Sequence, residues 1–303
     1  MEKYKELENL IDPIRIKYNV SMKDYTTVCV GGNCDCLVTP TNIEELQKVL
    51  GFAKSNNIEY YIIGNGSNLL VVDEDVHVLI IKLASKFSEY KIEDETIECL
   101  AGLSMPKVSL IAKQNSLEGF EFACGIPGTV GGGVKMNAGA YGSEFVNVVE
   151  EVKYINDEGE IVTVKNEDLN YSYRHSIFTE HPTYVVVSAK FKLKKGNVEE
   201  IDAKMKENSR LRKEKQPLEY PNFGSVFKRP KGYFVGKLII ESGLQGYQIG
   251  GAQVSTKHAG FIVNVDNATC KDILDLIEHI KGVVHEKFGV MLETEVQFIG
   301  GKK

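Results

Sequence analysis

The first clear pattern of apolar and polar positions along the chain is helical. From Ile43 to Ser55 apolar residues recur every three or four positions, and Thr41 followed three residues later by Glu44 has the form of a capping box. Short strands around a Gly-Gly turn in "VCVGGNCDCLVTP" precede this helix, and "IEYYII" follows it as a buried strand. This order predicts a β-α-β unit.

The most complete set of start and stop signals belongs to a C-terminal helix. Thr269 and Asp272 form a capping box, an apolar face runs from about Cys270 to Phe288, and Gly289 supplies the stop. Helical patterns are also present in three other segments: the charged start "MEKYKELENL", residues 106–115 after Ser104, and residues 198–211.

A period of two marks the middle of the chain as β structure. From "VVEEVKYINDEGEIVTV" to "TYVVVSAKFKL" the pattern predicts antiparallel strands, with "NDEG" as a hairpin turn. The same alternation in "MLETEVQFI" places Glu293 and Glu295 on the face opposite Leu292. Together these elements predict an α+β protein of three parts, residues 1–85, 86–196 and 197–303.

Composition narrows the class of protein. A net charge of −6 over 303 residues argues against a nucleic-acid or anionic-membrane partner. No apolar run approaches the roughly 20 residues of a membrane span, so a cytoplasmic protein is expected. Of the six cysteines, Cys29, Cys34 and Cys36 cluster, but no fourth soft ligand lies close, and we predict no metal site.

Two glycine-rich loops are candidates for binding a phosphate-containing ligand. In "IIGNGSNLLVV" a Rossmann fingerprint is ruled out because position 69 is Leu and strand-like residues follow. Either a nest of backbone N–H groups or a hairpin turn explains this loop. In "GIPGTVGGGVKMNAGAYG" seven glycines occur within Gly125 to Gly142, which suggests either a dinucleotide held between the two loops or a tightly packed structural loop.

Three polar residues are candidates for catalysis. Ser225 in "EYPNFGSVFKRP" lacks the glycines of a nucleophile elbow and has no histidine nearby, which argues against a nucleophile and leaves proton transfer as a role to be tested. Arg174 in "YSYRHSIF" is surrounded by aromatic and hydroxyl residues and could stabilise negative charge on oxygen, although a surface arginine is the alternative. Glu295 points either to solvent or into a cleft.

The chain resembles the UDP-N-acetylenolpyruvoylglucosamine reductase family, also called UDP-N-acetylmuramate dehydrogenases. The resemblance runs from about Tyr25 to Gly300 and rests on "GNGSNLLV", "EFACGIPGTVGG", "MNAGAYG", "YSYRHSIF", "QPLEYPNFGSVFKRP", "GGAQVSTKHAGFIVN" and "LETEVQFIG". It implies an α+β fold, with a two-part FAD-binding region of the vanillyl-alcohol-oxidase type in residues 1–85 and 86–196. It also implies a C-terminal α+β substrate domain in residues 197–303, in the compact subtype of the family.

The resemblance implies roles for individual residues. Reduced FAD delivers hydride to the enolpyruvyl β-carbon of a UDP-sugar, Arg174 and Glu295 stabilise the enolic species, and Ser225 donates the proton, while NADPH reduces the flavin. The implied substrate contacts are Tyr173, Lys228 and Asn264, with Arg229 as an alternative to Lys228. The implied FAD contacts are Gly64, Asn65, Gly66, Ser67, Asn68, Leu69, Gly125, Ile126, Pro127, Gly128, Thr129, Gly131, Gly132, Asn137, Ala138, Gly139, Ala140 and Arg212.

Two other functions remain open on the sequence alone. A different flavin oxidase or dehydrogenase could use the same scaffold, since fold does not determine function. A nucleotide-sugar binder without catalysis would purify without flavin, and the presence of Ser225, Arg174 and Glu295 together argues against it.

Overall fold

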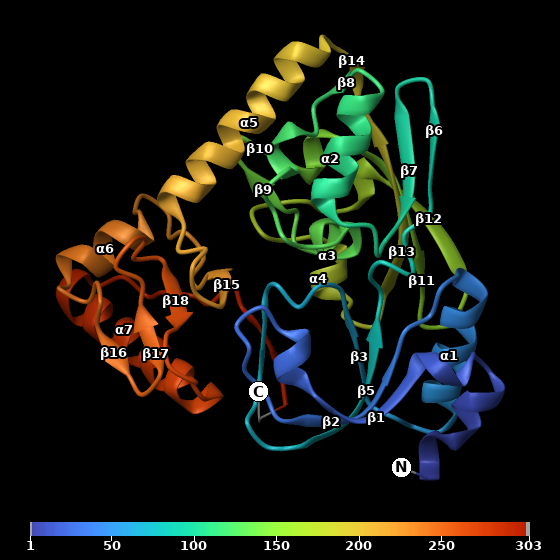
Figure 1. The fold of residues 1–303 in the computed structure, drawn as a ribbon, viewed down its shortest axis with the longest axis horizontal. Helices are drawn as coiled ribbons and strands as arrows, with labels where there is room; N and C mark the ends of the chain where they lie inside the picture. The colour runs from blue at the N-terminus through green and yellow to red at the C-terminus, as the bar shows by residue number, and fades with distance from the viewer. Residues whose placement is uncertain (1, 301–303) are drawn as a thin grey trace. The chain divides into compact units, whose positions relative to one another are not determined.

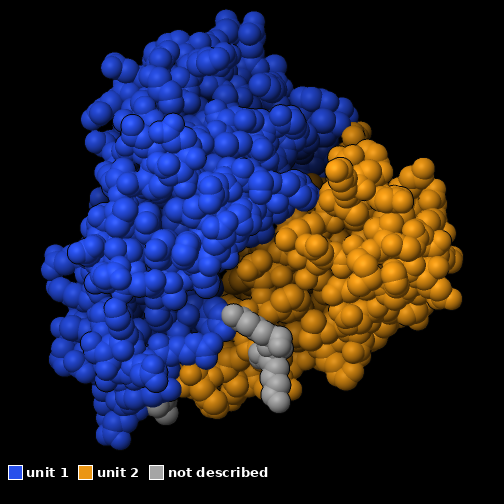
Figure 2. Space-filling model, turned by 180° about the vertical axis from the view of Figure 1, so that it is seen from behind, with its two compact units in different colours: residues 1–18, 36–65, 78–212 blue, residues 19–35, 66–77, 213–303 orange. Residues whose placement is uncertain are grey.

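The computed structural model describes residues 2–300, and the chain forms two compact units (Figure 2). Unit 1 comprises the residues up to Tyr18 together with Cys36–Asn65 and Val78–Arg212. Unit 2 comprises Asn19–Asp35, Gly66–His77 and the residues from Lys213 onward. Each unit has its own core of buried apolar side chains, as expected of a compact domain.

A four-stranded sheet in the order β1-β2-β5-β3 contains the predicted β-α-β unit (Figure 1). Strand β2 (Asn33–Val38) leads into α1 (Ile43–Ser55), which leads into β3 (Tyr60–Ile63). β3 pairs in parallel with β5 (Val76–Lys82), and β1 (Ile16–Ser21) forms the opposite edge. The predicted unit is therefore confirmed, with β5 inserted between its two strands.

Helix α1 begins where predicted, but its cap differs from the predicted capping box. The N-cap is Asn42, whose side chain accepts a hydrogen bond from the amide of Glu45. The carboxylate of Glu45, rather than that of Glu44, accepts the Thr41 amide at 2.8 Å and pairs with Arg15 at 2.6 Å. Two strands, β1 and β2, separate Arg15 from the helix, so a contact outside the local sequence selects between the neighbouring glutamates.

The second sheet is antiparallel, in the order β12-β11-β13-β7-β6. The predicted hairpin turn at "NDEG" is confirmed, because Ile155 lies opposite Ile161 across it. Phe120, Phe145 and Phe191 pack edge to face in the core of unit 1. The strands are β6 (Tyr90–Glu93), β7 (Thr96–Leu100), β11 (Val149–Ile155), β12 (Ile161–Lys165) and β13 (Val185–Lys192).

The helices predicted at 106–115 and 198–211 are confirmed as α2 (Met105–Gln114) and α5 (Val198–Lys215). The N-terminal segment forms a 3₁₀ helix, Glu2–Asn9. The pattern did not predict α3 (Val130–Lys135) within the glycine-rich segment or the short α4 (Ile177–Glu180). The other short elements of the chain are 3₁₀ turns Pro13–Arg15, Met22–Tyr25, Glu121–Ala123, Phe145–Asn147 and Asn166–Asp168, with strands β8 (Leu117–Glu118), β9 (Gly139–Ala140), β10 (Ser143–Glu144) and β14 (Lys194–Lys195).

Unit 2 is built on an antiparallel sheet in the order β15-β18-β17-β16, with a parallel pair formed by β4 and β19. Helices α6 and α7 contact each other, and their apolar faces contribute to the core of this unit. The elements are β4 (Leu69–Val71), β15 (Asn222–Ser225), α6 (Val235–Glu241), β16 (Gln248–Ile249), β17 (Ala252–Val254), β18 (Phe261–Asn264), α7 (Cys270–Phe288) and β19 (Gln297–Ile299).

Helix α7 has the predicted ends. Thr269 and Asp272 each accept the other's backbone amide in a capping box, and Gly289 ends the helix in the left-handed region with φ 67°. Two further amides at its start, those of Cys270 and Lys271, donate to the carboxylate of Asp73 at 2.8 and 3.1 Å. This helix start therefore has both a local cap and a distant one.

The compact units divide the chain differently from the predicted parts 1–85, 86–196 and 197–303. Segments 19–35 and 66–77 belong to unit 2 because Thr27 bonds to Asn222, Asn264 to Val28, and Asp73 to Cys270. These pairs are 195 to 236 positions apart, so the order of elements does not reveal them. The flavin-binding and substrate-binding roles of the predicted parts stay predictions.

Within residues 2–300, no helix is both long enough and apolar enough to cross a membrane.

Candidate active site and flavin-binding loops

The first glycine-rich loop, residues 64–68, joins strands of two different sheets. β3 before it pairs with β5, whereas β4 after it pairs in parallel with β19. The strands on either side of the loop therefore do not form a hairpin with each other. This topology excludes the hairpin-turn interpretation of the Asn-Gly pair.

Within unit 1 the start of this loop contacts the second glycine-rich segment. The side-chain Nδ2 of Asn65 donates to the carbonyl of Pro127 at 2.9 Å. A Cβ atom on Gly64 would lie 2.3 Å from the Thr129 hydroxyl oxygen, which is closer than any contact a side chain can make. Glycine at position 64 is therefore needed for the two segments to approach each other.

Several glycines of residues 125–142 serve close packing inside unit 1. A Cβ on Gly133 would lie 2.4 Å from the Phe145 ring, and one on Gly131 would lie 3.0 Å from the Cβ of Ala101. Gly132 differs, because the nearest atom to its Cβ position is 3.9 Å away and the residue is exposed. Packing explains the first two glycines, and the predicted approach of main chain to a ligand fits Gly132.

Residues 127–130, between Gly125 and Gly131, are anchored by hydrogen bonds to the start of α2. The amide of Met105 donates to the carbonyl of Gly128 at 3.1 Å, and that of Val130 donates to Leu103 at 2.8 Å. Ser104 and Thr129 form an isolated antiparallel bridge between these contacts. Backbone hydrogen bonds therefore fix the conformation of residues 127–130.

Arg212 lies beside Gly125, in the last turns of α5. A Cβ on Gly125 would meet the Arg212 Cδ at 2.9 Å. Burial lowers the pKa of the Arg212 guanidinium, and the nearby Tyr141 and Cys124 act in the opposite direction. The Tyr141 hydroxyl in turn donates to the carbonyl of Asn208 at 2.9 Å. A half-buried guanidinium beside a glycine-rich backbone is suited to an anionic group.

Arg174 occupies the tip of a two-residue hairpin in unit 1. Ser172 and His175 exchange backbone hydrogen bonds of 3.2 Å in both directions, and Arg174 has a left-handed φ of 56°. A residue with a Cβ pays strain in that region, so the surrounding contacts must hold it. The side-chain Nδ2 of Asn137 donates to the Ser172 carbonyl at 3.0 Å, and an Arg174 guanidinium nitrogen donates to the Gly139 carbonyl at 3.5 Å. The hairpin tip is therefore attached to residues 137–139, which are among the predicted flavin contacts.

Unit 2 brings Ser225 and Glu295 onto adjacent segments of chain. Ser225 is the last residue of β15, and the amide of Glu295 donates to the carbonyl of the next residue, Val226, at 2.8 Å. Phe227 and Thr294 form an antiparallel bridge one step further along. Ser225 is exposed while Val226 and Phe227 are buried, so its hydroxyl is presented at the surface of this unit.

Asn68 connects the first glycine-rich loop to Glu295 within unit 2. Its side-chain Nδ2 donates to the Glu295 carbonyl at 3.1 Å, and its own carbonyl accepts the Gln297 amide at 3.0 Å. A residue predicted to contact flavin therefore also holds the backbone of a predicted catalytic residue.

The predicted substrate residues have different surroundings. The Lys228 amine lies 3.5 Å from the carboxylate of Glu293, and Tyr173 is about half exposed at the hairpin tip. Asn264 is buried: its Nδ2 donates to the Val28 carbonyl at 3.0 Å and its Oδ1 accepts the Ala268 amide at 2.8 Å. The Asn264 amide thus joins segments of unit 2, and a contact with substrate stays a prediction.

The predicted site residues are divided between the two units. Unit 2 brings Ser225 and Glu295 together, and Arg174 belongs to unit 1. In unit 1 are Gly64, Asn65, Gly125, Ile126, Pro127, Gly128, Thr129, Gly131, Gly132, Asn137, Ala138, Gly139, Ala140, Tyr173, Arg174 and Arg212; in unit 2 are Gly66, Ser67, Asn68, Leu69, Ser225, Lys228, Asn264 and Glu295.

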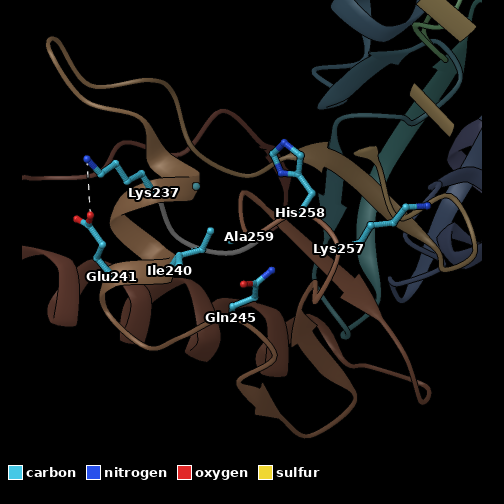
Figure 3. A pocket seen from close by; sticks show the side chains of 8 residues that line it. Lys237, Ile240, Glu241, Gln245, Lys257, His258 and Ala259 are labelled. Carbon is cyan, nitrogen blue, oxygen red and sulfur yellow. Dashed lines mark ion pairs between the residues drawn. The ribbon is translucent and has the colours of Figure 1, made fainter. Parts of the chain in front are cut away.

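A shallow depression of about 410 Å³ lies elsewhere in unit 2, between α6 and residues 257–259 (Figure 3). Its polar side chains already have partners: Lys237 faces Glu241 at 3.7 Å, and Gln245 donates to the Thr256 carbonyl. The Lys257 amine donates to a backbone carbonyl at 2.8 Å. No predicted catalytic or flavin-binding residue lines it.

The three clustered cysteines of the sequence have different surroundings. Cys34 and Cys36 are buried, and Cys29 is exposed. Burial raises the pKa of the Cys34 thiol to about 11, which disfavours the thiolate that a metal would need. Over residues 2–300 no group of three or more His, Cys, Asp or Glu side chains is arranged to hold a metal ion.

The sequence reasoning did not single out Asn222, whose Oδ1 accepts the amide of Gly224, the residue before Ser225. An asparagine two positions before a glycine is the pattern of an Asx turn, and this signal is present in "NFGS".

The loops of unit 1 fit an extended anionic cofactor. They provide a defined backbone segment at residues 127–130, an open glycine at position 132, and the guanidinium of Arg212. Backbone N–H groups and a guanidinium are the donors that recognise a diphosphate. The FAD contacts predicted on this segment are consistent with that donor set.

Comparisons with known proteins agree with the predicted family. Residues 34–165 match the FAD binding domain family, and residues 216–299 match the C-terminal domain of UDP-N-acetylenolpyruvoylglucosamine reductase. The UDP-N-acetylenolpyruvoylglucosamine reductases of Clostridium novyi (strain NT) and Clostridium tetani (strain Massachusetts / E88) are 46% and 47% identical to this chain. Those alignments cover 98% and 100% of this chain and 96% and 99% of the relatives.

Solved structures give the same result for the fold. The crystal structure of UDP-N-acetylenolpyruvylglucosamine reductase from Thermus caldophilus has a TM-score of 0.80 and 37% identity, over 94% of this chain and 98% of that chain. Phl p 4.0202, a glucose dehydrogenase, shares the fold alone, with a TM-score of 0.52 and 13% identity over 96% of this chain and 64% of that one. The predicted α+β fold with an FAD-binding region is confirmed. With 46% identity over almost its whole length, the chain belongs to the UDP-N-acetylenolpyruvoylglucosamine reductase family and is an FAD-dependent oxidoreductase.

Proposed function

We propose that the protein reduces the enolpyruvyl ether of UDP-N-acetylglucosamine to UDP-N-acetylmuramate, a precursor of peptidoglycan, with NADPH as the electron source. The observation that carries the proposal is the sequence identity of 46% and 47%, over 98% and 100% of this chain, to two UDP-N-acetylenolpyruvoylglucosamine reductases. Both NADPH and the UDP-sugar are metabolites of the cytoplasm, and we place the protein there.

FAD bound here would supply hydride transfer from NADPH to the enolpyruvyl β-carbon. We assign its binding to the backbone and polar side chains of residues 64–69, 125–132 and 137–140, with Arg212 as the cation for its diphosphate. Asn65, bonded to Pro127, keeps the first of these loops against the second within unit 1. The oligomeric state does not enter this proposal.

Hydride arrival leaves negative charge on the substrate carboxylate as an enolate, which needs donors. Arg174 supplies a permanently protonated planar donor, and its left-handed backbone is held by the contacts of Ser172 and Gly139. Glu295 assists as a hydrogen-bonded acid. A strained but well-supported backbone is common at sites where a side chain must be pre-aimed.

Protonation of the α-carbon completes the reaction, and we assign this proton to the Ser225 hydroxyl. An enolate is basic enough to accept a proton from a hydroxyl of ordinary acidity, provided the O–H is within about 3 Å. Support comes from the exposure of Ser225 on a strand end beside the Glu295 segment. Lys228, Tyr173 and Asn264 are the proposed contacts for the rest of the UDP-sugar.

The reaction can be tested with the purified flavin-loaded protein, NADPH and the enolpyruvyl UDP-sugar. We expect NADPH oxidation to require the sugar, with a product heavier by two hydrogen atoms in mass spectrometry. Flavin reduction by free sugars or alcohols, with no oxidation of NADPH by the enolpyruvyl substrate, would instead identify another flavin oxidoreductase.

A further inference from the structure

The strand that carries Ser225 has one residue more than the strand beside it. Asn222 pairs with Val263 and Ser225 pairs with Phe261, so three steps along β15 match two steps along β18. This mismatch is a β-bulge. In a regular strand Phe223 and Ser225 would share a face, yet Phe223 is 2% exposed and Ser225 is exposed. The bulge therefore turns Ser225 away from the core that receives Phe223.

Asn222 and Gly224 hold the bulge in shape. The Asn222 Oδ1 accepts the Gly224 amide at 3.0 Å, and Gly224 has a φ of 84°, which favours glycine. The other end of the Asn222 amide, Nδ2, donates to the carbonyls of Pro217 at 3.2 Å and Tyr220 at 2.9 Å. Both ends of the side chain are thus bonded to backbone on either side of the strand start.

Backbone contacts hold the strand before and after the bulge. The backbone amide of Asn222 donates to the Thr27 carbonyl at 3.1 Å, and the Thr27 hydroxyl donates to the backbone carbonyl of Asn222 at 2.6 Å. Beyond Ser225, the Val226 amide donates to the Gly260 carbonyl at 3.0 Å. With both ends held, the conformation of the bulge decides the direction of the Ser225 hydroxyl.

We propose that Asn222 is a positioning residue for the proton donor: its side-chain amide stabilises the bulge that aims the Ser225 hydroxyl at the reacting carbon. The inference rests on the proposed role of Ser225. In this role Asn222 acts through Ser225 and needs no contact of its own with substrate or flavin.

The test measures the two half-reactions separately by stopped flow on flavin-loaded protein. For Asn222→Ala we expect flavin reduction by NADPH to change less than about threefold and reoxidation by the enolpyruvyl sugar to slow about 10- to 100-fold, as a misplaced group does. Gly224→Ala should have the same effect by a second route. An added Cβ there meets no atom within 4 Å, so only the backbone at φ 84° is strained.

Each variant has a matched control. Asn156 makes the same type of turn in the β11–β12 hairpin, accepting the amides of Glu158 and Glu160 at 3.0 and 2.9 Å, so Asn156→Ala loses comparable bonds elsewhere. Gly243 in unit 2 has a φ of 76° and equally open space, so Gly243→Ala introduces the same strain away from β15. Both controls should leave the rate of reoxidation within about threefold of the unsubstituted protein.

The Ser225→Ala background separates positioning from folding. If Asn222 acts through the hydroxyl, Asn222→Ala added to Ser225→Ala slows reoxidation no further, because effects of residues acting as a unit are not additive. A further 10-fold loss in that background, or equal slowing of both half-reactions, would overturn the proposal. If Ser225→Ala alone is reoxidised at the normal rate, Ser225 is not the proton donor. This result therefore distinguishes failure of the proposed function of Ser225 from failure of the proposed role of Asn222.

Discussion

Gly64→Ala tests whether the contact between the two glycine-rich segments controls flavin binding. The new methyl group would lie 2.3 Å from the Thr129 Oγ1, 3.0 Å from its Cγ2 and 3.2 Å from its Cβ. The two closest atoms, Oγ1 and Cγ2, both belong to the Thr129 side chain. Thr129 is 3% exposed, and its backbone forms an isolated bridge with Ser104. The threonine cannot swing away freely, so the loop of residues 64–65 must move from residues 127–129.

The expected size of the effect follows from overpacking. Inserting a methyl group into a well-packed contact typically destabilises by about 1–3 kcal/mol. If that energy falls on the flavin-bound arrangement of the loops, FAD binding weakens by roughly 5- to 150-fold, since about 1.4 kcal/mol is a factor of ten. The dissociation constant is measured by titrating the deflavinated protein with FAD and following flavin fluorescence.

A compensating substitution makes the test specific. In Gly64→Ala/Thr129→Ala the two closest atoms are removed and the remaining contact is 3.2 Å, which the loops can absorb with a small shift. Because Thr129 is itself a proposed FAD contact, the reference is Thr129→Ala alone, and Gly64→Ala should weaken FAD binding less in that background than in the unsubstituted protein. Gly51→Ala is the matched control, because a Cβ on this residue of α1 meets nothing within 4 Å.

If Gly64→Ala binds FAD as tightly as the unsubstituted protein, the contact between the two glycine-rich segments does not control flavin binding. An effect of Gly64→Ala on FAD binding that is equally large in the Thr129→Ala background would also contradict the predicted clash, because the clash would then not involve the Thr129 side chain.

Three further predictions concern stability and the enolate. Asp73→Ala removes two hydrogen bonds at the start of α7 and should lower the unfolding free energy by about 1–2 kcal/mol in urea titrations, without changing NADPH-dependent flavin reduction. Hydrogen bonds from Lys113 and Lys206 lower the pKa of Asp202 from 3.8 to about 2, so the stabilisation exists above pH 4 and is lost as pH falls toward 2. The stability difference between the unsubstituted protein and Asp202→Asn should thus shrink between pH 6 and pH 2, and a gap independent of pH would contradict this. Arg174→Lys keeps the charge but loses the planar fork, and we expect reoxidation by the enolpyruvyl sugar to slow about 10-fold or more, measured by stopped flow.

Elements with strong local signals were predictable from the sequence. Helix α7 has the predicted residues at both ends because its capping box and stop are formed by neighbours in sequence. At α1 the position was right and the cap was wrong, since Arg15 selects Glu45 over Glu44. Local spacing cannot distinguish two adjacent carboxylates when a distant cation makes the choice.

Which segments belong to which compact unit was also not predictable, because contacts between residues distant in sequence decide it. Hydrogen bonds that involve the side chains of Thr27, Asn264 and Asp73 attach early segments to unit 2 across 195 to 236 positions of the chain. Each of these side chains is polar and short, and nothing in its immediate sequence specifies its partner. The compact units therefore group segments that the order of helices and strands keeps apart.

The candidate site was predicted mainly from its motifs, and the structure gives other physical reasons for some of its residues. Glycine density in residues 125–142 suggested approach to a ligand, whereas Gly131 and Gly133 are needed to pack against Ala101 and Phe145. The direction of Ser225 depends on a bulge, and alternation alone would have placed the serine on the buried face with Phe223. Asn222 and Gly224 are the local signals from which that bulge could have been anticipated.

The most direct measurement is the rate of each half-reaction in Ser225→Ala. A hydroxyl that donates the proton to the α-carbon is not needed when NADPH reduces the flavin. We therefore expect reduction at close to the normal rate and reoxidation by the enolpyruvyl sugar slowed by about 10² to 10⁴. Reoxidation at the normal rate, or the same slowing in both steps, would contradict the role of Ser225.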